Sequence, residues 1–413
     1  MTRPMEPTDA TATPDVPRPP TGVGDGRQLL DWLRTMRDRH PVWRDDMTGA
    51  AHVFRYDDLL KVLSSPDVFS SDFSAIMPPP DPDAPNFTEG VLTMTDPPRH
   101  GKLRRLVSQA FTPRMVAQLE PKVETLTREL FDTVAGQRDF DLVSAVAYPL
   151  PVIVIAEMLG IPPADRELFR GWGEALLSTN YELPVGAVPD GTMPEQIAGQ
   201  LKEMHAYLLG HVQDRRTTPR DDLISRLVTA EVDGDALTDG ETVSFLNFLL
   251  LAGHLTTSLL MGNTLLSFAD EPAQLKAVRE DRELVPAALE EVLRHRPPVV
   301  FQARVTRQET ELAGVTLPAN VPVMCWQMSG NRDERHFAEP DRFDISRKPN
   351  THLTFGHGIH FCIGTPLARL ESRIVLNELL DRYRQVDVGT PVYYERSPEI
   401  FGVKSLPITV QTA

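Results

Sequence analysis

The chain has 413 residues, of which 58 are acidic and 42 basic, so its formal net charge is −16 and its pI about 5.2. This balance argues against a nucleic-acid-binding protein, which would need a basic face. The 41% hydrophobic and 24% charged residues are typical of a globular protein with a large core. Two cysteines are too few for a disulfide framework and indicate a reducing, cytoplasmic location.

The N-terminal 25 residues differ in composition from the rest of the chain. Six of the first 20 residues are prolines, and no apolar stretch has the length of a signal peptide or a membrane span. We expect residues 1–25 to be a disordered tail. The remainder, 26–413, contains no internal repeat and no linker, and its most apolar runs are too short to cross a bilayer. The simplest interpretation is one large, soluble domain.

Along the chain, the hydrophobic pattern is mainly helical. Apolar residues at helical spacing predict helices over Leu29–Met36, Leu103–Phe111, Val116–Val134, Val152–Leu159 and Gln196–Arg215. Strand-like segments are few and short: Ala51–Arg55, Gln302–Val305, Glu311–Leu317, Val321–Met328 and Val403–Val410. Two stretches rich in turn residues, Ser71–Gly90 and Ser178–Glu195, predict long loops of the kind that form lids. The fold class is therefore mainly α, an α+β pattern with small sheets.

A long helix is predicted over Glu241–Asp270, and its first half is apolar on every side, which places it in the core. Polar groups then interrupt it at Gly253, His254, Thr256 and Thr257. A packing kink and an opening beside a buried site both account for such an interruption.

The strongest chemical signal is Phe-Gly-His-Gly-Ile-His-Phe-Cys-Ile-Gly, residues 355–364. Its cysteine, Cys362, lies among glycines at the entry to a predicted helix, where the dipole and free N–H groups favour thiolate. Such a sulfur suits a metal. A buried structural cysteine is the alternative, and a zinc cluster of His352, His357, His360 and Cys362 is a minor one, since zinc's usual paired spacing is missing.

This segment resembles the haem-binding signature of the cytochromes P-450, FxxGxxxCxG, at every fixed position, including Phe355, Cys362 and Gly364. Glu291 and Arg294 resemble the family's ExxR pair, and Arg342 resembles the third member of its buried ion network. The order of these motifs along the chain also agrees with the family, from about residue 26 to the end.

The resemblance implies a single helical P-450 fold with haem b (heme b, iron protoporphyrin IX) between the long central helix and the cysteine-loop helix. Cys362 would be the iron ligand. The residues that match the family's propionate-binding positions are His100, Arg104, Arg304 and His360. Asp96 is expected to cap the helix that carries the first two.

In the central helix, the family pattern places an acid before a threonine that delivers protons to dioxygen. Thr256 occupies the threonine position and is the expected catalytic residue, but Leu255 stands where the acid belongs. Three explanations are open: a water chain or His254 supplies Thr256, a substrate hydroxyl replaces the acid, or the reaction avoids ordinary scission of dioxygen. For His254 itself, a helix contact is favoured over a place beside oxygen.

The implied function is a monooxygenase that inserts one oxygen atom of O2 into a mostly apolar substrate, such as a polyketide, terpenoid or peptide. The expected substrate contacts are Leu249, Ala252, Leu255, Val299, Val300 and Phe401. Atypical haem-thiolate chemistry (oxidative coupling, isomerisation or peroxide use) and a non-catalytic haem protein are the alternatives.

Electrons would come from a ferredoxin and its reductase, because no flavin domain or dinucleotide motif is present. Four basic residues form either a docking face for an acidic ferredoxin or an ordinary solvated helix face: Lys102, Arg104, Arg105 and Arg114. A monomer without nucleic-acid or membrane partners is expected.

Overall fold

The computed structural model describes residues 16–20, 22–77, 90–180, 195–394 and 399–412. Its α-helices are α1 (Arg27–Arg39), α2 (Tyr56–Leu63), α3 (Arg99–Ala110), α4 (Pro113–Gln118), α5 (Glu120–Asp132), α6 (Pro149–Met158), α7 (Arg166–Asn180), α8 (Glu195–Thr217), α9 (Leu223–Thr229), α10 (Asp239–Asp270), α11 (Pro272–Glu280), α12 (Val285–His295), α13 (Gln327–Gly330) and α14 (Thr365–Arg382). Single helical turns are η1 (Leu92–Met94), η2 (Val143–Ala147), η3 (Pro163–Asp165), η4 (Arg282–Leu284) and η5 (Gly358–His360).

The strands are short: β1 (Val42–Arg44), β2 (Ala51–Val53), β3 (Phe69–Ser70), β4 (Asp139–Asp141), β5 (Glu231–Val232), β6 (Asp235–Ala236), β7 (Gln302–Thr306), β8 (Thr310–Leu312), β9 (Val315–Leu317), β10 (Pro322–Cys325), β11 (Tyr383–Val388), β12 (Val392–Tyr393), β13 (Val403–Ser405) and β14 (Pro407–Thr412). The predicted fold class, mainly helical with small sheets, is confirmed.

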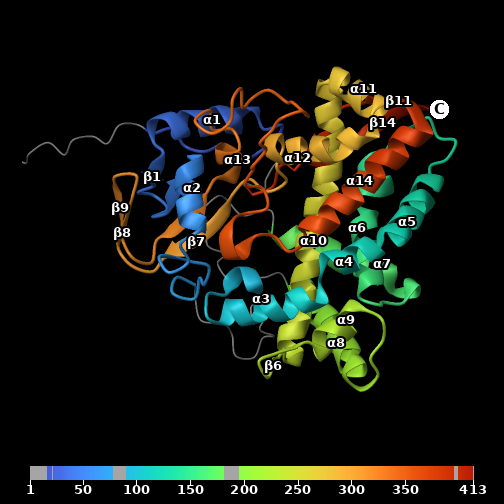
Figure 1. Ribbon diagram of the computed structural model, residues 1–413, viewed down its shortest axis with the longest axis horizontal. Coiled ribbons are helices and arrows are strands. Elements are labelled where there is room, and N and C mark those ends of the chain that lie inside the picture. Colours follow the sequence, from blue (N-terminus) through green and yellow to red (C-terminus); the bar gives the residue numbers. More distant parts are fainter. Residues whose placement is uncertain (1–15, 21, 78–89, 181–194, 395–398, 413) are drawn as a thin grey trace, which may run out of the picture.

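The elements separate into a β-rich region and a helical region (Figure 1). The largest sheet has the strand order β1-β2-β10-β7-β3, with α1, α2 and α13 beside it, and a second sheet has the order β11-β14-β4. Strands β2 and β10 pair in parallel, with Ala51 opposite Val323, so this sheet joins chain segments far apart in sequence. The other large helices gather around α10, the long yellow helix of Figure 1.

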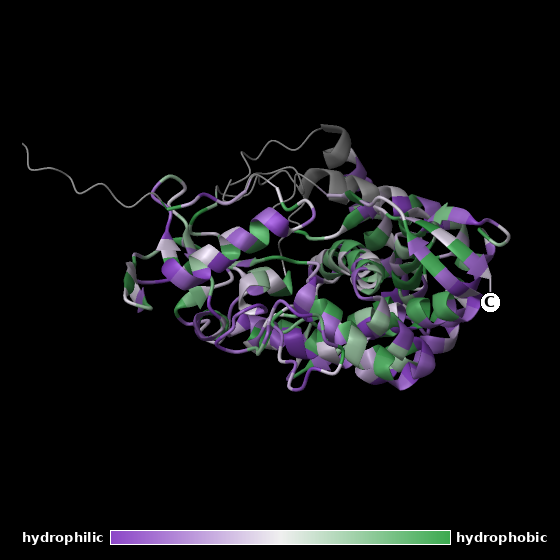
Figure 2. Cartoon of the chain, turned by 90° about the horizontal axis from the view of Figure 1, so that it is seen from above, coloured by the Kyte–Doolittle hydropathy of each residue, from purple (hydrophilic) through white to green (hydrophobic). Residues whose placement is uncertain are grey.

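Helix α10 is the core helix that the apolar pattern predicted. It begins with a capping box, in which the Thr238 hydroxyl accepts from the Glu241 amide and the Glu241 carboxylate accepts from the Thr238 amide. It packs against α6, α7, α8, α12 and α14. By length and composition α10 could cross a membrane, but 72% of its most apolar window is buried inside the protein. Figure 2 shows apolar residues around this helix and hydrophilic residues toward the rim.

Local details differ from the predictions. The single helix predicted over Val116–Val134 is two helices, because α4 ends at Gln118 and α5 begins with a proline in its first turn. The strand predicted over Val321–Met328 ends at Cys325, and α13 follows. Asp96 does not cap α3, which starts at Arg99 with Pro98 as N-cap.

The two predicted long loops fall mostly outside the described residues. Of the first, residues 71–77 and 90 are described. Of the second, residues 178–180 and 195 are described, and they form the end of α7 at Asn180 and the start of α8 at Glu195.

Candidate active site

The loop that carries Cys362 is held by its own backbone. The Cys362 amide donates to the Phe355 carbonyl at 2.9 Å, and the Thr365 hydroxyl donates to the Cys362 carbonyl at 2.9 Å. Gly358 has a φ of +69°, and a Cβ there would lie 2.8 Å from the Leu63 carbonyl oxygen, so only glycine fits. Helix α14 then begins at Thr365. Cys362 therefore precedes a helix N-terminus, whose dipole favours a thiolate.

A cavity of about 300 Å³ lies between α10 and the cysteine loop, where the resemblance places the haem. Its mostly apolar wall is formed by residues from η1, α3 and α10, from the end of α12 through the start of β7, and from the cysteine loop with the start of α14. They are Leu92, Thr93, Arg104, Phe245, Phe248, Leu249, Ala252, Gly253, Thr256, Thr257, Leu260, Leu293, Pro298, Val299, Gln302, Thr354, Phe355, His360, Cys362, Ile363, Gly364 and Ala368.

The four basic residues that match the propionate positions lie together beside this cavity. The rings of His100 and His360 are 4.3 Å apart between centroids, and Arg104 and His360 line the cavity wall. Burial, together with the positive charges of Arg304 and His100, lowers the pKa of His360 to about 3. Burial also lowers the pKa of His100 and of Arg304. Each of these groups would be stabilised by an anion placed among them.

The cluster and the cavity fit a haem group. Nε2 of His100 is buried and has no hydrogen-bond partner among the described residues. The Arg304 guanidinium is buried, donates to a backbone carbonyl at 2.7 Å and forms no ion pair within the described chain. Two propionates would supply an acceptor for His100 and a counter-charge for Arg304, Cys362 would hold the iron, and Phe355 and Gly364 lie on the cavity wall. Haem, when bound, supplies the oxygen chemistry, and the thiolate donates electron density that favours O–O cleavage.

The polar residues in the middle of α10 lie beside the cavity. The Thr256 hydroxyl donates to the Ala252 carbonyl at 2.6 Å, and both residues, with Gly253 and Thr257, line the wall. Because the Thr256 hydroxyl donates its proton to this carbonyl, the Thr256 oxygen can accept a hydrogen bond from a group in the cavity. Helix α10 stays continuous here, so the interruption in the apolar pattern corresponds to an opening rather than to a break.

His254 and Leu255 lie away from the cavity. The His254 ring packs 4.2 Å from that of Tyr148, and its Nε2 lies 3.0 Å from the Tyr148 carbonyl oxygen. Burial lowers the pKa of His254 to about 4, so the ring is neutral at pH 7. Leu255 is 1% exposed and packs with Leu259 and Ile400. The helix contact favoured for His254 is therefore present, and the idea that His254 supplies protons to the threonine is wrong.

Half of the predicted substrate contacts lie on the cavity wall. These are Leu249, Ala252 and Val299. The other three are buried in the apolar core and are not part of the wall: Leu255, Val300 and Phe401. Phe401 packs against Gly26, where a Cβ would lie 2.7 Å from its ring, and its ring lies beneath the Arg296 guanidinium. Apolar character alone could not distinguish a wall residue from a core residue.

Several wall residues were not predicted. Phe245 and Phe248 stand one helical turn before Leu249 and Ala252, so the helical spacing could have identified them. No sequence signal could have identified Leu92, Thr93 and Gln302, which come from a single helical turn and from the start of a strand.

The buried ion network differs from the prediction in one member. Glu291 and Arg294 form a doubly hydrogen-bonded pair at 2.8 Å, and neither side chain is exposed. The third side chain is Arg347, whose Nε lies 3.2 Å from Glu291. Arg342 was predicted wrongly: its side chain is 59% exposed and pairs with Glu339, and only its backbone carbonyl meets Arg294.

The zinc alternative finds no support in the geometry. Among the described residues, no group of three or more His, Cys, Asp or Glu side chains could hold a metal ion. Nε2 of His352 instead lies 3.2 Å from Glu290, and Nε2 of His360 lies 3.0 Å from the Ser71 hydroxyl.

This fold and site define a haem-thiolate enzyme, and comparison with known proteins gives its family. The sequence matches the cytochrome P450 family over residues 26–411. It is 44% identical to cyclomarin C epoxidase CymV of Salinispora arenicola, over 94% of this chain and 98% of that protein. It is 45% identical to the erythromycin C-12 hydroxylase of Saccharopolyspora erythraea, over 94% and 96% of the two chains. The chain belongs to the cytochrome P450 family and is a monooxygenase.

Solved structures agree with this assignment. The ligand-free cytochrome P450 TbtJ1 superimposes with a TM-score of 0.85 at 46% identity, covering 94% of this chain and 98% of that one. The open form of EryK from S. erythraea superimposes with a TM-score of 0.87 at 43% identity, covering 97% and 98% of the two chains. The P450 fold is therefore confirmed, and family membership implies a haem-thiolate cofactor.

Proposed function

We propose that this enzyme hydroxylates or epoxidises a large, mostly apolar specialised metabolite of the polyketide, terpenoid or peptide class. The observation that carries this proposal is the cavity, which has Cys362 on one side, Thr256 on another and a largely apolar wall between them. Relatives named for the epoxidation of cyclomarin C and the hydroxylation of erythromycin support it. We assign the activity to residues 26–413 as one catalytic domain, acting as a monomer in the cytoplasm.

The cofactor in this proposal is haem b. Cys362 ligates the iron, and Phe355 and Gly364 lie against the macrocycle. The propionates are bound by His100, Arg104, Arg304 and His360. Nε2 of His100 has no hydrogen-bond partner and Arg304 has no ion pair within the described chain, and both observations support this assignment, because buried polar groups usually have partners in folded proteins.

The test of this proposal is the ferrous-CO difference spectrum of the purified protein, with Cys362→Ser as its comparison. We expect a strongly red-shifted Soret band that the substitution abolishes, because serine supplies no thiolate. A folded, haem-supplied protein without a haem spectrum would overturn the assignment. Substrates are then found by titrating candidate metabolites against the Soret band.

Proton supply centres on Thr256, which we propose as the catalytic residue beside bound dioxygen. Its hydroxyl donates to the Ala252 carbonyl, which leaves its oxygen able to accept from a water or a substrate hydroxyl that would complete the relay in place of an acid. Thr256→Val keeps the shape and removes the hydroxyl. We expect the variant to consume NAD(P)H with most electrons diverted to peroxide, measured as the ratio of product to NAD(P)H oxidised.

Atypical chemistry remains the second candidate because Leu255 replaces the family's acid. Leu255 fills an apolar cluster, so Leu255→Glu would bury a carboxyl there. We expect this substitution to lower the melting temperature by several degrees without improving coupling, whereas Leu255→Met leaves both unchanged. Better coupling in Leu255→Glu would show that a relay is missing. Product formed with peroxide alone, or without any oxygen incorporation, would favour the atypical reactions.

Electron delivery requires a docking face near Cys362, and we propose an acidic ferredoxin as its partner. Two of the basic residues expected there are neutralised, because Lys102 pairs with Asp235 at 2.6 Å and Arg105 pairs with Asp233 at 3.0 Å. Arg114 is exposed and forms no ion pair within the described residues. Of these three residues, Arg114 on α4 is therefore the one whose charge is free of an ion pair within the described residues.

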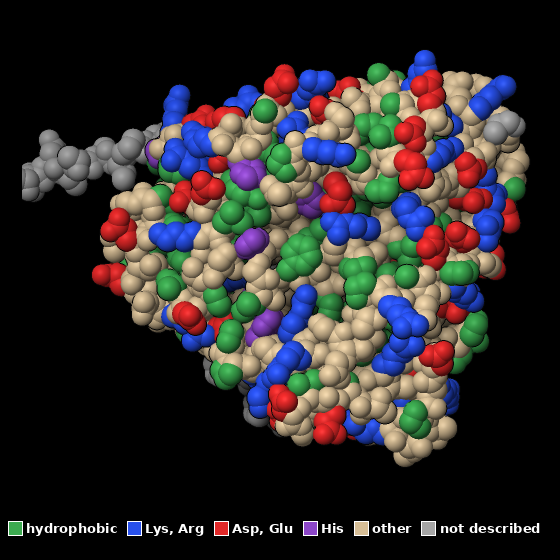
Figure 3. Space-filling model, in the orientation of Figure 1, with side chains coloured by type: hydrophobic (Ala, Val, Ile, Leu, Met, Phe, Trp, Pro, Cys, Tyr) green, Lys and Arg blue, Asp and Glu red, His purple; other side chains and the backbone are tan. Residues whose placement is uncertain are grey.

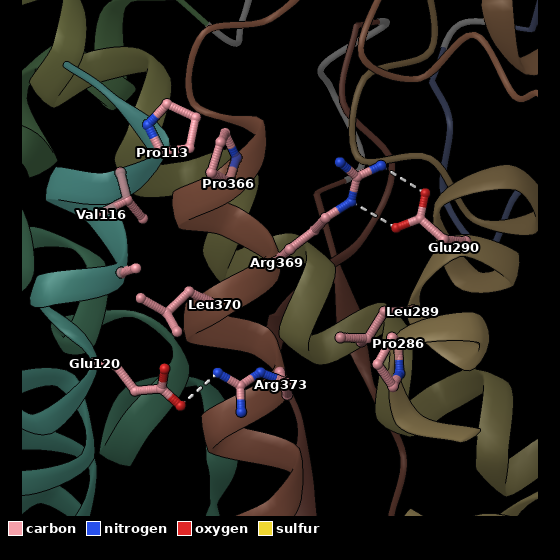
Figure 4. Close-up of a pocket in the computed structure, with 11 residues that line it drawn as sticks. Pro113, Val116, Glu120, Pro286, Leu289, Glu290, Pro366, Arg369, Leu370 and Arg373 are labelled. Carbon is pink, nitrogen blue, oxygen red and sulfur yellow. Dashed lines mark hydrogen bonds and ion pairs between the residues drawn. The ribbon is translucent and has the colours of Figure 1, made fainter. Parts of the chain in front are cut away.

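A surface groove of about 450 Å³ lies beside this position (Figure 4). Its sides come from α4, α5, α12 and α14, and its floor includes Val116, Leu289 and Leu370. Ion pairs hold its two arginines, Arg369 to Glu290 at 2.6 Å and Arg373 to Glu120 at 2.7 Å. Figure 3 shows apolar, basic and acidic side chains mixed on this face. An apolar floor with paired charges at its rim suits a partner that buries apolar surface, and Arg114 beside it supplies positive charge for an acidic one.

Steady-state kinetics against ferredoxin concentration test this docking face. We expect Arg114→Glu to raise the apparent KM for ferredoxin several-fold, most strongly at low salt, while kcat at saturation stays unchanged. The matched control is the double variant Lys102→Ala with Asp235→Ala, which removes a pair without changing net charge. An unchanged KM in Arg114→Glu would contradict the proposal.

A further inference from the structure

One buried carboxylate, Asp96, lies at the meeting point of three segments distant in sequence. Its oxygens accept from the Ser70 hydroxyl, from the Ser71 amide at 2.9 Å and from the Arg307 guanidinium. Its side chain is 6% exposed. A carboxylate with this many donors is locked in one orientation, and it fixes the positions of the groups that donate to it.

Through Ser71, the hydrogen-bond network of Asp96 extends to the basic residues beside the cavity. The Ser71 hydroxyl lies 3.0 Å from Nε2 of His360, two residues before the cysteine. This contact, together with the neighbouring His100 ring, determines which way the His360 imidazole faces. On the other side, Ser70 and Arg307 flank β7, the strand that carries Arg304, because β3 pairs with β7 there. The hydrogen bonds of Asp96 therefore reach His360 on one side and β7, the strand that carries Arg304, on the other.

Asp96 is also the acidic group that faces this cluster. Burial raises its pKa, but the hydrogen bonds from Ser70, Ser71 and Arg307 outweigh burial and hold the pKa below its usual value. The carboxylate therefore stays ionised at neutral pH, and its charge acts on His100 and Arg304, each of which it stabilises in the charged form. It lowers the mutual repulsion of these groups without pairing directly with any of them.

We propose that Asp96 and Ser71 are positioning residues for the haem carboxylates: they orient His360 and hold β7 so that two anionic groups can enter between the basic side chains. This inference rests on the proposal that His360 and Arg304 bind the propionates. It assigns to Asp96 a role different from the helix cap that its sequence position suggested.

The experiment compares four haem-loaded proteins: the unchanged enzyme, Asp96→Asn, Ser71→Ala and the control Asp72→Asn. Asp72 lies in the same segment and is exposed, and among the described residues its carboxylate accepts only from the Ser74 amide, so its substitution removes the same charge without touching the hydrogen-bond network of Asp96. Two properties are measured: the rate at which haem transfers to excess apomyoglobin, and the ferric–ferrous midpoint potential.

We expect haem to leave Asp96→Asn and Ser71→Ala about tenfold faster, the effect of losing one well-formed hydrogen bond. Only Asp96→Asn should also shift the midpoint potential to a more positive value, because it removes a negative charge near the cofactor whereas Ser71→Ala does not. A merely structural loss would not separate the two variants in this way. Asp72→Asn should behave as the unchanged enzyme.

The inference is overturned if Ser71→Ala and a folded Asp96→Asn both retain haem at the unchanged rate with an unchanged potential. If Asp96→Asn does not fold, Ser71→Ala alone decides, since it deletes a single hydroxyl. Failure of the unchanged protein to bind haem would instead overturn the proposed function, so the two failures are distinguishable.

Discussion

Two clusters of buried charge differ in how they are satisfied. In the first, every oxygen of Glu291 is occupied: Arg294, Arg347, Asn350 and the Asp344 amide all donate to it. In the second, Nε2 of His100 has no hydrogen-bond partner and Arg304 has no ion pair within the described chain. Both clusters match motifs in the sequence. The closed cluster stabilises the fold, whereas the open cluster indicates a ligand, because isolated buried charge is too costly to retain without one.

Breaking the closed cluster should have the largest effect on stability. Glu291→Gln leaves Arg294 buried without a charge partner, and we expect a loss of about 3–5 kcal/mol in the free energy of unfolding. Thermal and urea unfolding of the apoprotein measure this loss. Because the pair is fully buried, the loss should be almost independent of salt. A loss below about 1 kcal/mol would mean that the network relaxes and is not closed.

Glu371 on α14 sharpens the comparison, since it is a single buried carboxyl whose Oε2 has no partner among the described residues. Burial raises its pKa to about 8 from an ordinary 4.5, so the folded protein holds a proton that the unfolded chain releases. Stability is therefore full below pH 4.5 and falls as pH rises to 8, by on the order of 3 kcal/mol at pH 7. Glu371→Gln should flatten this dependence in urea unfolding measured from about pH 5 to 8. An unchanged slope of stability against pH would mean that another group causes the pH dependence.

The open cluster should respond with opposite signs in the apo and haem-loaded proteins. Arg304→Met removes a buried cation that has no ion-pair partner in the described chain, so the apoprotein should gain about 1–2 kcal/mol of stability. The haem-loaded variant should lose haem faster, because one carboxylate loses its donor. Melting curves of both forms measure the two effects. A loss of stability in both forms would mean that the charge of Arg304, like those of the closed cluster, is satisfied within the protein.

The sequence predicted these sites unevenly. Motifs with fixed spacing located Cys362, the Glu291–Arg294 pair and the basic cluster, because each depends on residue types that have few alternative uses in the core. Sequence could not locate side chains whose role depends on direction. Leu255 and Ala252 are both apolar α10 residues three positions apart, yet only Ala252 lies on the cavity wall. The wall residues from η1 likewise depend on how distant segments pack.

Arg342 and Arg347 also show that sequence does not reveal the direction of a side chain, and the difference between them can be measured. Each arginine closes a turn of its own, Arg342 with Glu339 and Arg347 with Asp344, and the motif alone does not decide which one reaches Glu291. In the structure Arg347 is 10% exposed and donates to three backbone carbonyls as well as to Glu291, whereas Arg342 is 59% exposed.

Replacing each arginine by alanine separates the two positions, and the expected losses are smaller than that of Glu291→Gln. Arg347→Ala should cost about 1–3 kcal/mol, because it leaves buried acceptors without a donor. Arg342→Ala should cost less than about 0.5 kcal/mol, since an exposed ion pair contributes little and the carbonyl that meets Arg294 is unaffected. Equal losses in urea unfolding would contradict this order. They would place Arg342 inside the network, in the position that the sequence motif had suggested.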